Sequence, residues 1–217
     1  MKKFDGFIFD IDGTLTSTNK LIFASFNHVA EKYLNKTLTD KEIISLFGPP
    51  EDVILQKWFG NNYESARKDY YNFYAKKHNE LAKIFPGIEE ILKIIKQANL
   101  PVSIFTGKGR KTSEITLKKL GIFNYFNMIV TGDDVKNHKP SSEGIRMFLN
   151  KFNLEPFKVL MIGDAPSDIK AAREAGVKIA TVVWDSYAKE KVLKMKSDYV
   201  FHSVEELKEL VEQALTH

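Results

Sequence analysis

Residues 7–15 read Phe-Ile-Phe-Asp-Ile-Asp-Gly-Thr-Leu, an apolar run that ends in two carboxylates, a glycine and a hydroxyl. The run predicts a buried strand, and open α/β sheets bind their ligands at the carboxyl ends of such strands. Side chains two apart on a strand point the same way, so we expect Asp10 and Asp12 to serve one site. An ordinary strand that ends in a polar turn is the alternative, because Asp and Gly are common turn residues.

Apolar strand patterns recur along the chain and alternate with helical patterns. The pattern predicts strands at residues 4–9, 102–105, 128–130, 159–162, 178–182 and 199–201. It predicts helices at residues 88–98, 111–120, 141–152, 167–175 and 204–215. Such alternation is typical of an α/β fold, so we predict a Rossmann-like parallel sheet with helices on both faces.

One segment, residues 16–84, interrupts the alternation and shows only helical periodicity. Four helices are expected within it, at residues 21–34, 40–47, 51–59 and 63–84. We call this segment the cap and predict an all-helical cap domain, inserted into an α/β core domain of residues 1–15 and 85–217. Hinges are expected at residues 16–18 and at residues 85–87. In the second segment a stiff proline stands beside a conformationally permissive glycine.

The composition excludes several kinds of site and partner. The chain has no cysteine, which excludes disulfides, thiolate zinc sites and cysteine nucleophiles, and its histidines are scattered. The net charge of +4 comes from scattered lysines rather than a clustered basic face, so we expect no nucleic-acid partner. No apolar run approaches the length of a membrane span or a signal peptide, so we expect no membrane contact and a cytoplasmic location.

Two further segments carry groups that suit phosphate binding. Residues 104–110 place Thr106 and free backbone N–H groups before a predicted helix, where such groups hold phosphate oxygens. The alternative is that Thr106 only caps that helix. Lys139 precedes Pro140 before another predicted helix and offers a point positive charge for a phosphoryl group or a carboxylate. Taken alone, Lys139 is also compatible with an ordinary surface lysine.

A last motif adds two carboxylates. Residues 159–168 form an apolar run that ends in Gly-Asp, with Asp164 at the end of the run and Asp168 four residues later. These acids are also compatible with a purely electrostatic role at a helix N-terminus. Together with Asp10 and Asp12 they predict four carboxylates in one cleft, which need positive compensation. Mg²⁺ fits best, because it binds through few carboxylates and accepts phosphate oxygens as further ligands.

The ordered set of Asp-x-Asp, a strand-terminal Thr, Lys-Pro and Gly-Asp-x-x-x-Asp resembles the haloacid dehalogenase-like hydrolase superfamily over essentially the whole chain. Within that superfamily it is similar to the subgroup that carries a helical cap after the first motif, which includes phosphoglycolate phosphatases. The resemblance implies a Mg²⁺-dependent phosphatase that hydrolyses a small-molecule phosphate monoester through an aspartyl-phosphate. A small phosphate ester is therefore the expected partner, and a monomer or weak homodimer the expected state.

The resemblance also implies roles for single residues. Asp10 matches the nucleophile that receives the phosphoryl group, and Asp12 matches the general acid and base. Thr106, Gly107 and Lys139 match the positions that bind the phosphate.

Metal ligands follow from the same resemblance. Asp10, Asp164 and the backbone carbonyl of Asp12 match the ligands, and Asp168 matches a position that supports the metal. The chain departs from the usual pattern at Ala165, where a hydroxyl is common. It departs again at residues 184–185, which read Trp-Asp rather than Trp-Gly, so we expect a different entrance near that loop.

Substrate selection is expected from the cap. The rigid turn Gly48-Pro49-Pro50-Glu51 lies between two predicted cap helices, and the corresponding loop of similar proteins faces the site. A simple helix connector is the alternative for this turn. Lys108 and Arg110 are further candidates that would meet a substrate carboxylate or an acid of the cap, unless both are solvated.

Other activities are compatible with the same motifs. A sugar phosphomutase similar to β-phosphoglucomutase and an inorganic pyrophosphatase are the enzymatic alternatives. A non-catalytic protein that binds a phosphorylated ligand is a third, because a fold does not guarantee activity. A signalling receiver domain also uses Asp, Mg²⁺, Thr and Lys, but its accepting Asp ends a later strand and it carries no cap.

Overall fold

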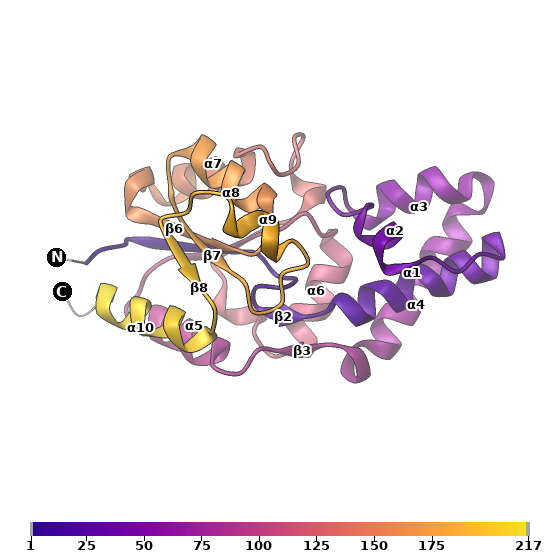
Figure 1. Ribbon diagram of the computed structural model, residues 1–217, viewed down its shortest axis with the longest axis horizontal. Coiled ribbons are helices and arrows are strands. Elements are labelled where there is room, and N and C mark those ends of the chain that lie inside the picture. Colours follow the sequence, from indigo (N-terminus) through magenta and orange to yellow (C-terminus); the bar gives the residue numbers. More distant parts are fainter. Residues whose placement is uncertain (1, 216–217) are drawn as a thin grey trace.

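A six-stranded parallel sheet forms the centre of the computed structural model, which describes residues 2–215 (Figure 1). Its strands lie in the order β5-β4-β1-β6-β7-β8. Their bounds are β1 Gly6–Phe9, β4 Val102–Phe105, β5 Met128–Val130, β6 Val159–Gly163, β7 Lys178–Val182 and β8 Tyr199–Phe201. Because β1 lies between β4 and β6, the residues that follow these three strands meet at one edge of the sheet.

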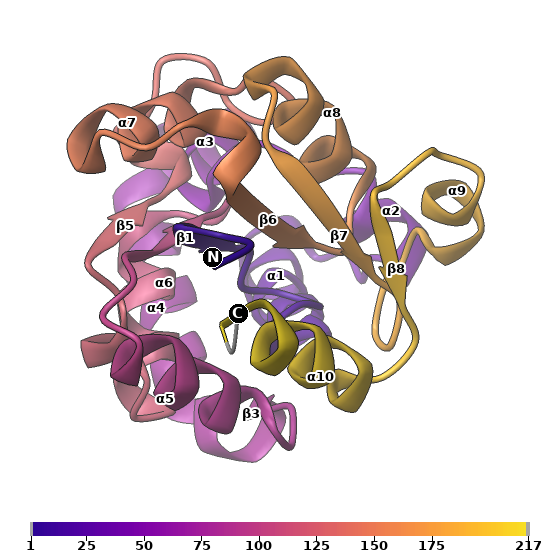
Figure 2. The same ribbon diagram turned by 90° about the vertical axis from the view of Figure 1, so that its left-hand side faces the viewer.

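Helices cover both faces of this sheet, as the alternating pattern predicted (Figure 2). One face carries α5 Ile88–Gln97, α6 Arg110–Lys119 and α10 Val204–Leu215, and the other carries α7 Glu143–Phe152, α8 Pro166–Ala175 and α9 Lys189–Leu193. In β1, Phe7 and Phe9 pack into one apolar core, and Ile8 packs into the other. A strand that is buried on both faces reads as a continuous apolar run, which explains the sequence pattern.

The cap helices lie to one side of the sheet, on the right in Figure 1. They are α1 Asn19–Leu34, α2 Asp40–Ile44, α3 Glu51–Phe59 and α4 Tyr63–Leu81. They enclose an apolar cluster of their own, in which the rings of Phe26 and Tyr70 lie 5.1 Å apart. Short 3₁₀ helices add η1 Gly60–Asn62, η2 Phe123–Tyr125, η3 Gly132–Asp134 and η4 Pro156–Lys158. The structure thus has the expected helical insertion, and its exact domain limits stay a prediction.

The prediction that residues 16–84 hold no strand is wrong at both ends of the cap. Strand β2 (Thr16–Ser17) pairs antiparallel with β3 (Lys83–Ile84), and α4 ends before β3 rather than running through it. Two-residue strands are too short to show periodicity, and the same holds for α9, which was not expected either. The two connections between cap and core therefore form one short ribbon.

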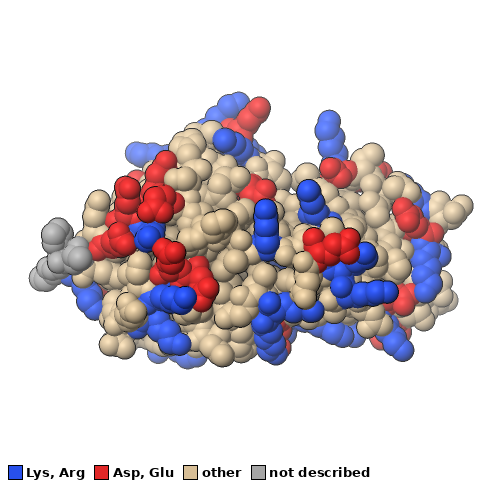
Figure 3. Space-filling view, turned by 90° about the horizontal axis from the view of Figure 1, so that it is seen from below, with Lys and Arg blue, Asp and Glu red and all other residues tan. Residues whose placement is uncertain are grey.

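Charged side chains are mixed in sign over the surface. On the face shown in Figure 3, residues of both signs lie over the core and over the cap, and acidic residues gather toward the left-hand end. This mixing agrees with a net charge of only +4. Among residues 2–215, none of the helices combines the length and the apolarity that crossing a bilayer requires.

A second contact between cap and core joins α4 to α6. The hydroxyl of Tyr74 lies 2.8 Å from Thr116 Oγ1, and His78 Nε2 lies 3.3 Å from the same oxygen. All three side chains are buried, and Ile115 of α6 packs against the apolar cluster of the cap. The cap is therefore seated on the core by a buried polar contact as well as by its connecting ribbon.

We predict that His78 makes the fold sensitive to acid. Burial, helped by Lys119 and Lys108, lowers the pKa of His78 from 6.5 to about 4. Between these values the unfolded chain binds a proton at His78 that the folded chain does not, so stability falls as the pH falls from about 6.5 to about 4. Replacing His78 by Asn should remove about 2 kcal/mol of the acid-induced loss in the free energy of unfolding.

Denaturant unfolding at pH 7 and pH 4.5 measures this difference. The exposed His202 is the matched control, and its replacement by Asn should leave the pH dependence of the wild type unchanged. Equal pH dependence in the wild type and in the His78 variant would contradict the prediction.

Candidate active site

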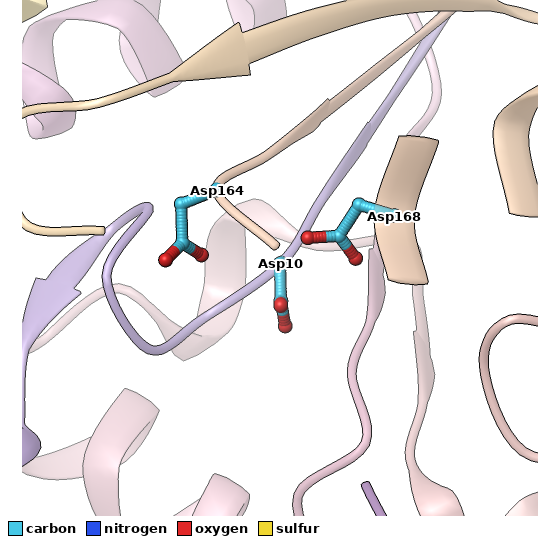
Figure 4. Close-up of side chains that lie close together, drawn as sticks. All are labelled: Asp10, Asp164 and Asp168. Atoms are coloured by element: carbon cyan, nitrogen blue, oxygen red, sulfur yellow. The ribbon is translucent and has the colours of Figure 1, made fainter. Parts of the chain in front are cut away.

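Three carboxylates gather at the carboxyl ends of the central strands (Figure 4). Asp10 follows β1, Asp164 follows β6, and Asp168 lies in the first turn of α8. Each offers a carboxylate oxygen within 4.8 Å of the others. The backbone N–H of Asp10 donates to Ile162 O at 2.9 Å, so the pairing of β1 with β6 continues up to this cluster. Two neighbouring parallel strands therefore fix the site.

Asp164 carries an oxygen that no group of residues 2–215 satisfies. Its Oδ1 accepts a hydrogen bond from Thr14 Oγ1 at 3.1 Å, whereas its buried Oδ2 has no hydrogen-bond partner. Burial, followed by the charges of Asp10 and Asp168, raises the pKa of Asp164 well above its usual range. Gly13 has a φ of +76°, and a Cβ there would lie 2.5 Å from Asp164 Oδ2. A divalent cation with oxygen ligands fits this buried, negatively charged recess.

Lys139 provides the positive charge beside the same carboxylates. Its Nζ lies 3.0 Å from Asp10 Oδ2 and 2.6 Å from Asp168 Oδ1, and it donates to Phe105 O at 3.1 Å. Burial lowers the pKa of Lys139, but Asp10 and Asp168 outweigh burial and raise it overall. Lys139 therefore stays charged, and the alternative of a solvated surface lysine is wrong, because its side chain is only 5% exposed.

The loop after β4 faces this group of charges. Thr106 and Gly107 line the same cavity as Asp10, and Thr106 is buried. The N-cap residue of α6 is Gly109, so Thr106 does not cap that helix. A Cβ on Gly107 would lie 2.9 Å from the backbone oxygen of Gly48, which shows how closely the cap approaches this loop.

The predicted cluster of four carboxylates has three members, because the Asp12 side chain points elsewhere. Asp12 accepts a hydrogen bond from Thr18 Oγ1, and its Oδ2 lies 3.2 Å from Lys108 Nζ. Strand β1 ends at Phe9, and the N–H groups of Thr14, Leu15 and Thr16 donate back to Ile11 O. The chain therefore turns after Ile11, and the two-residue alternation of a strand does not extend to Asp12. Asp12 still lines the cavity.

The pKa of Asp12 is raised, mainly by burial, while Lys108 and the Thr18 hydrogen bond act in the opposite direction. Burial lowers the pKa of Lys108, but Asp12 and other neighbouring groups raise it overall. Asp12 and Lys108 thus form a second, partly buried ion pair, separate from the pair of Asp10 and Lys139.

Most of the residues expected to select substrate face the cavity. Gly48, Pro49, Glu51 and Lys108 line it. Pro50 lies against Gly132 instead, where a Cβ on that glycine would meet its ring.

Arg110 is directed away from the cavity, contrary to expectation. It forms an ion pair with Asp134 and donates to Ile129 O at 2.9 Å. Arg110 begins α6, and at this position its side chain reaches η3 and the end of β5 rather than the site.

The cavity measures about 110 Å³, below the range of pockets that hold drug-sized ligands. Its floor carries the charged groups of the core, and its cap side is mostly apolar. The apolar lining comes from Ile22, Phe26, Phe47, Ile54 and Tyr187.

Several lining residues were not anticipated from the sequence. Asn19, Ser167 and the apolar cap residues are among them, and Thr18 is a further missed contact of Asp12. Tyr187 had a signal, because it lies two residues after the unusual Trp-Asp pair and its ring lies 5.2 Å from that of Phe47.

Known proteins similar in sequence to this chain include pyrophosphatases that match it over nearly its whole length. Pyrophosphatase PpaX of Bacillus velezensis is 32% identical over 209 residues, which cover 95% of this chain and 95% of that protein. Pyrophosphatase PpaX of Bacillus pumilus is 31% identical over 204 residues, which cover 94% of each chain.

Solved structures share the whole architecture. A structure described as a predicted phosphoglycolate phosphatase from Haemophilus somnus superimposes with a TM-score of 0.84 at 21% identity, over 97% of this chain and 99% of that one. Residues 7–182, which include the motifs at residues 7–15, 104–110, 139–140 and 159–168, match the haloacid dehalogenase-like hydrolases. The chain belongs to the haloacid dehalogenase-like hydrolase family.

Proposed function

We propose that the protein is a Mg²⁺-dependent phosphatase that hydrolyses a small, phosphoglycolate-like phosphate monoester through an aspartyl-phosphate on Asp10. The observation that carries the proposal is the placement of Lys139 between Asp10 and Asp168, beside the unsatisfied Oδ2 of Asp164. This arrangement combines a carboxylate nucleophile with the positive charge that a phosphoryl group needs. The small cavity above it suits a small substrate.

In the first step, an oxygen of Asp10 attacks phosphorus, and the bond from phosphorus to the leaving oxygen breaks. The backbone N–H of Ile11 donates to Asp10 Oδ1 at 2.8 Å, which fixes the orientation of the carboxylate. Lys139 and the Thr106 hydroxyl offset the charge on the phosphoryl oxygens. The expectation of free N–H groups after Thr106 is wrong for residues 108–110, because those N–H groups donate to Thr106, Glu51 and Asp133. Asp12 gives a proton to the leaving oxygen.

In the second step, Asp12 removes a proton from water, and that water attacks phosphorus of the aspartyl-phosphate. Inorganic phosphate leaves, and the Asp10 carboxylate and the Asp12 proton are restored. The raised pKa of Asp12 suits this role, because an acid–base group works best when its pKa approaches the working pH.

The residues that would hold Mg²⁺ are Asp10 and Asp164, with Asp168 in support and, by resemblance, the backbone carbonyl of Asp12. When bound, Mg²⁺ supplies charge neutralisation for the phosphoryl oxygens and reduces the repulsion between the carboxylates. Thr14 orients Asp164 by donating to its Oδ1. Lys139 orients Asp168 and Asp10 through its ion pairs with their carboxylates.

An inorganic pyrophosphatase is the second candidate, and it is favoured by the names of the PpaX relatives. Against it, Lys108 and Lys139 are the only cations among the cavity-lining residues that the structure describes, and both are already paired. Pyrophosphate brings a second highly charged phosphoryl group to the apolar cap side. The observed lining therefore favours the monoester. The oligomeric state, a monomer or weak homodimer, and the cytoplasmic location stay predictions.

We predict that a monoester is the better substrate. The purified protein should show a higher kcat/KM for 2-phosphoglycolate or another small alkyl phosphate than for pyrophosphate, because such a monoester brings less charge to the mostly apolar cap side than a second phosphoryl group does. A phosphate-release assay with Mg²⁺ measures both. Preference for pyrophosphate would support the second candidate, and conversion of β-glucose 1-phosphate to glucose 6-phosphate would reveal a mutase. Tight binding without turnover would indicate a non-catalytic protein.

We predict separable roles for Asp10 and Asp12. Asp10→Asn should form no phosphoenzyme with any substrate. Asp12→Asn should release about one equivalent of nitrophenolate from p-nitrophenyl phosphate and then stall with phosphate on Asp10, because nitrophenolate leaves without a proton but the attacking water lacks its base. With an alkyl phosphate, Asp12→Asn should lose about 10²–10⁴ in rate.

Stopped-flow absorbance and mass spectrometry of the quenched enzyme follow these steps. If Asp10→Asn trapped phosphate and Asp12→Asn did not, the two roles would be reversed.

We predict that Mg²⁺ stabilises the free protein. At a concentration near 100 times its Kd, Mg²⁺ should raise Tm by about 5 °C or more, because it binds only the folded chain. Asp164→Asn should abolish this shift, whereas Asp40→Asn, an exposed acid of α2, should retain it. Thermal unfolding with and without Mg²⁺, after treatment with a chelator, gives the comparison. A shift that survives Asp164→Asn would place the metal elsewhere.

A further inference from the structure

A buried row of charged side chains links the cap to Asp12. Lys108 Nζ lies 3.2 Å from Asp12 Oδ2 and 3.6 Å from Glu51 Oε1. The side chains of Lys108 and Glu51 are only 2% and 8% exposed. Asp12 and Lys108 belong to the core, whereas Glu51 belongs to the cap. The row is therefore complete only while the cap lies against the core.

The contacts of Glu51 all reach across to the core. As the first residue of α3, Glu51 follows the rigid turn of two prolines. Its Oε2 accepts a hydrogen bond from the backbone N–H of Gly109 at 2.7 Å, and its Oε1 accepts one from Thr112 Oγ1 at 2.6 Å. A buried carboxylate with two hydrogen bonds and a neighbouring cation is held in one orientation. Glu51 is thus more than part of a helix connector.

Lys108 depends on this carboxylate for its position. Its ammonium group lies over the ring of Tyr74, 4.9 Å from the centroid, and between the carboxylates of Asp12 and Glu51. Removal of Glu51 leaves Asp12 as the only carboxylate that the structure places within ion-pair distance of Lys108. Tyr74 still contacts the ammonium group, but a flexible lysine that loses one of its two carboxylate partners is held less firmly toward the other.

We propose that Glu51 is a positioning residue that acts through Lys108 to orient the Asp12 carboxylate toward the leaving oxygen. The inference rests on the proposed function, in which Asp12 transfers the proton. It adds a specific consequence of cap closure, because an open cap withdraws Glu51 and leaves Lys108 without its second anchor. A role for Glu51 in fastening the cap alone is the competing explanation.

The leaving group separates these two explanations. Glu51→Gln removes the charge that holds Lys108 but keeps the size of the side chain. We expect the first-turnover rate with an alkyl phosphate to fall by about 10- to 100-fold, a loss typical of a misplaced catalytic group. The burst rate with p-nitrophenyl phosphate should fall less than threefold, because nitrophenolate needs no proton. Equal losses for both substrates, or a rise in KM alone, would overturn the proposal.

A double-mutant cycle tests whether Glu51 acts through Lys108. Lys108→Met should also slow the alkyl phosphate selectively. Adding Glu51→Gln to Lys108→Met should cause no further selective loss, because the group through which Glu51 acts is already gone. Fully additive effects of the two substitutions would contradict the proposal.

Two more variants distinguish a loss of positioning from a general folding defect. Thr112→Val removes one hydrogen bond to Glu51 and keeps both charges, so it should give a smaller loss with the same selectivity. Asp52→Asn is the matched control, because Asp52 stands next to Glu51 but pairs with Arg67 within the cap, at 2.9 Å. It should retain wild-type rates with both substrates. Circular dichroism and thermal unfolding confirm that each variant is folded.

Failure of this inference is distinguishable from failure of the proposed function. If the wild type releases no phosphate from any monoester, or if Asp10→Asn keeps full turnover, the proposed function fails. If both of those tests succeed and Glu51→Gln behaves like the wild type with the alkyl phosphate, only the role of Glu51 is refuted.

Discussion

Negative charge at the ends of β1 and β6 is the constraint on which the rest of the structure depends. Asp10, Asp164 and Asp168 lie within 4.8 Å of one another in a buried recess, where like charges repel strongly. Lys139 offsets part of this charge through contacts of 3.0 Å and 2.6 Å. The remaining unsatisfied oxygen of Asp164 is available to a further positive group. The phosphoryl chemistry proposed for this edge of the sheet uses the same excess of charge.

The two lysines of the cavity, Lys139 and Lys108, neutralise different carboxylates. Lys139 is anchored entirely within the core, beside the carboxylates that the two central strands bring together. Lys108 lies between the core carboxylate of Asp12 and the cap carboxylate of Glu51. Lys139 therefore keeps its carboxylate partners in any position of the cap, whereas Lys108 has both of its carboxylate partners only while the cap lies against the core. This division places the proposed nucleophile, Asp10, and the proposed proton donor, Asp12, under different structural control.

Sequence patterns predicted those parts of the site that regular strands position. Asp10 and Asp164 directly follow buried strands, so their meeting at one edge was predictable from the parallel α/β pattern. The direction of the Asp12 side chain was not, because a turn rather than a strand determines it. The positions of Arg110 and Tyr187 depend on contacts with distant segments, which local periodicity does not predict; for Tyr187 only the unusual Trp-Asp pair nearby gave a hint. Local periodicity also could not predict the two-residue strands β2 and β3 at the base of the cap.

The pairing of Thr16 with Ile84 has a consequence for how such a chain changes over time. The polypeptide leaves the core after β1 and returns to it beside the point where it left. The cap between these two points is therefore equivalent to one closed loop inserted into the core. The entropy of closing a loop grows only slowly with its length. Insertions, deletions or wholesale exchange between these two points leave the register of β1 untouched. New specificity can therefore arise by remodelling one contiguous stretch of the gene while the strand ends that position Asp10 and Asp164 stay unchanged.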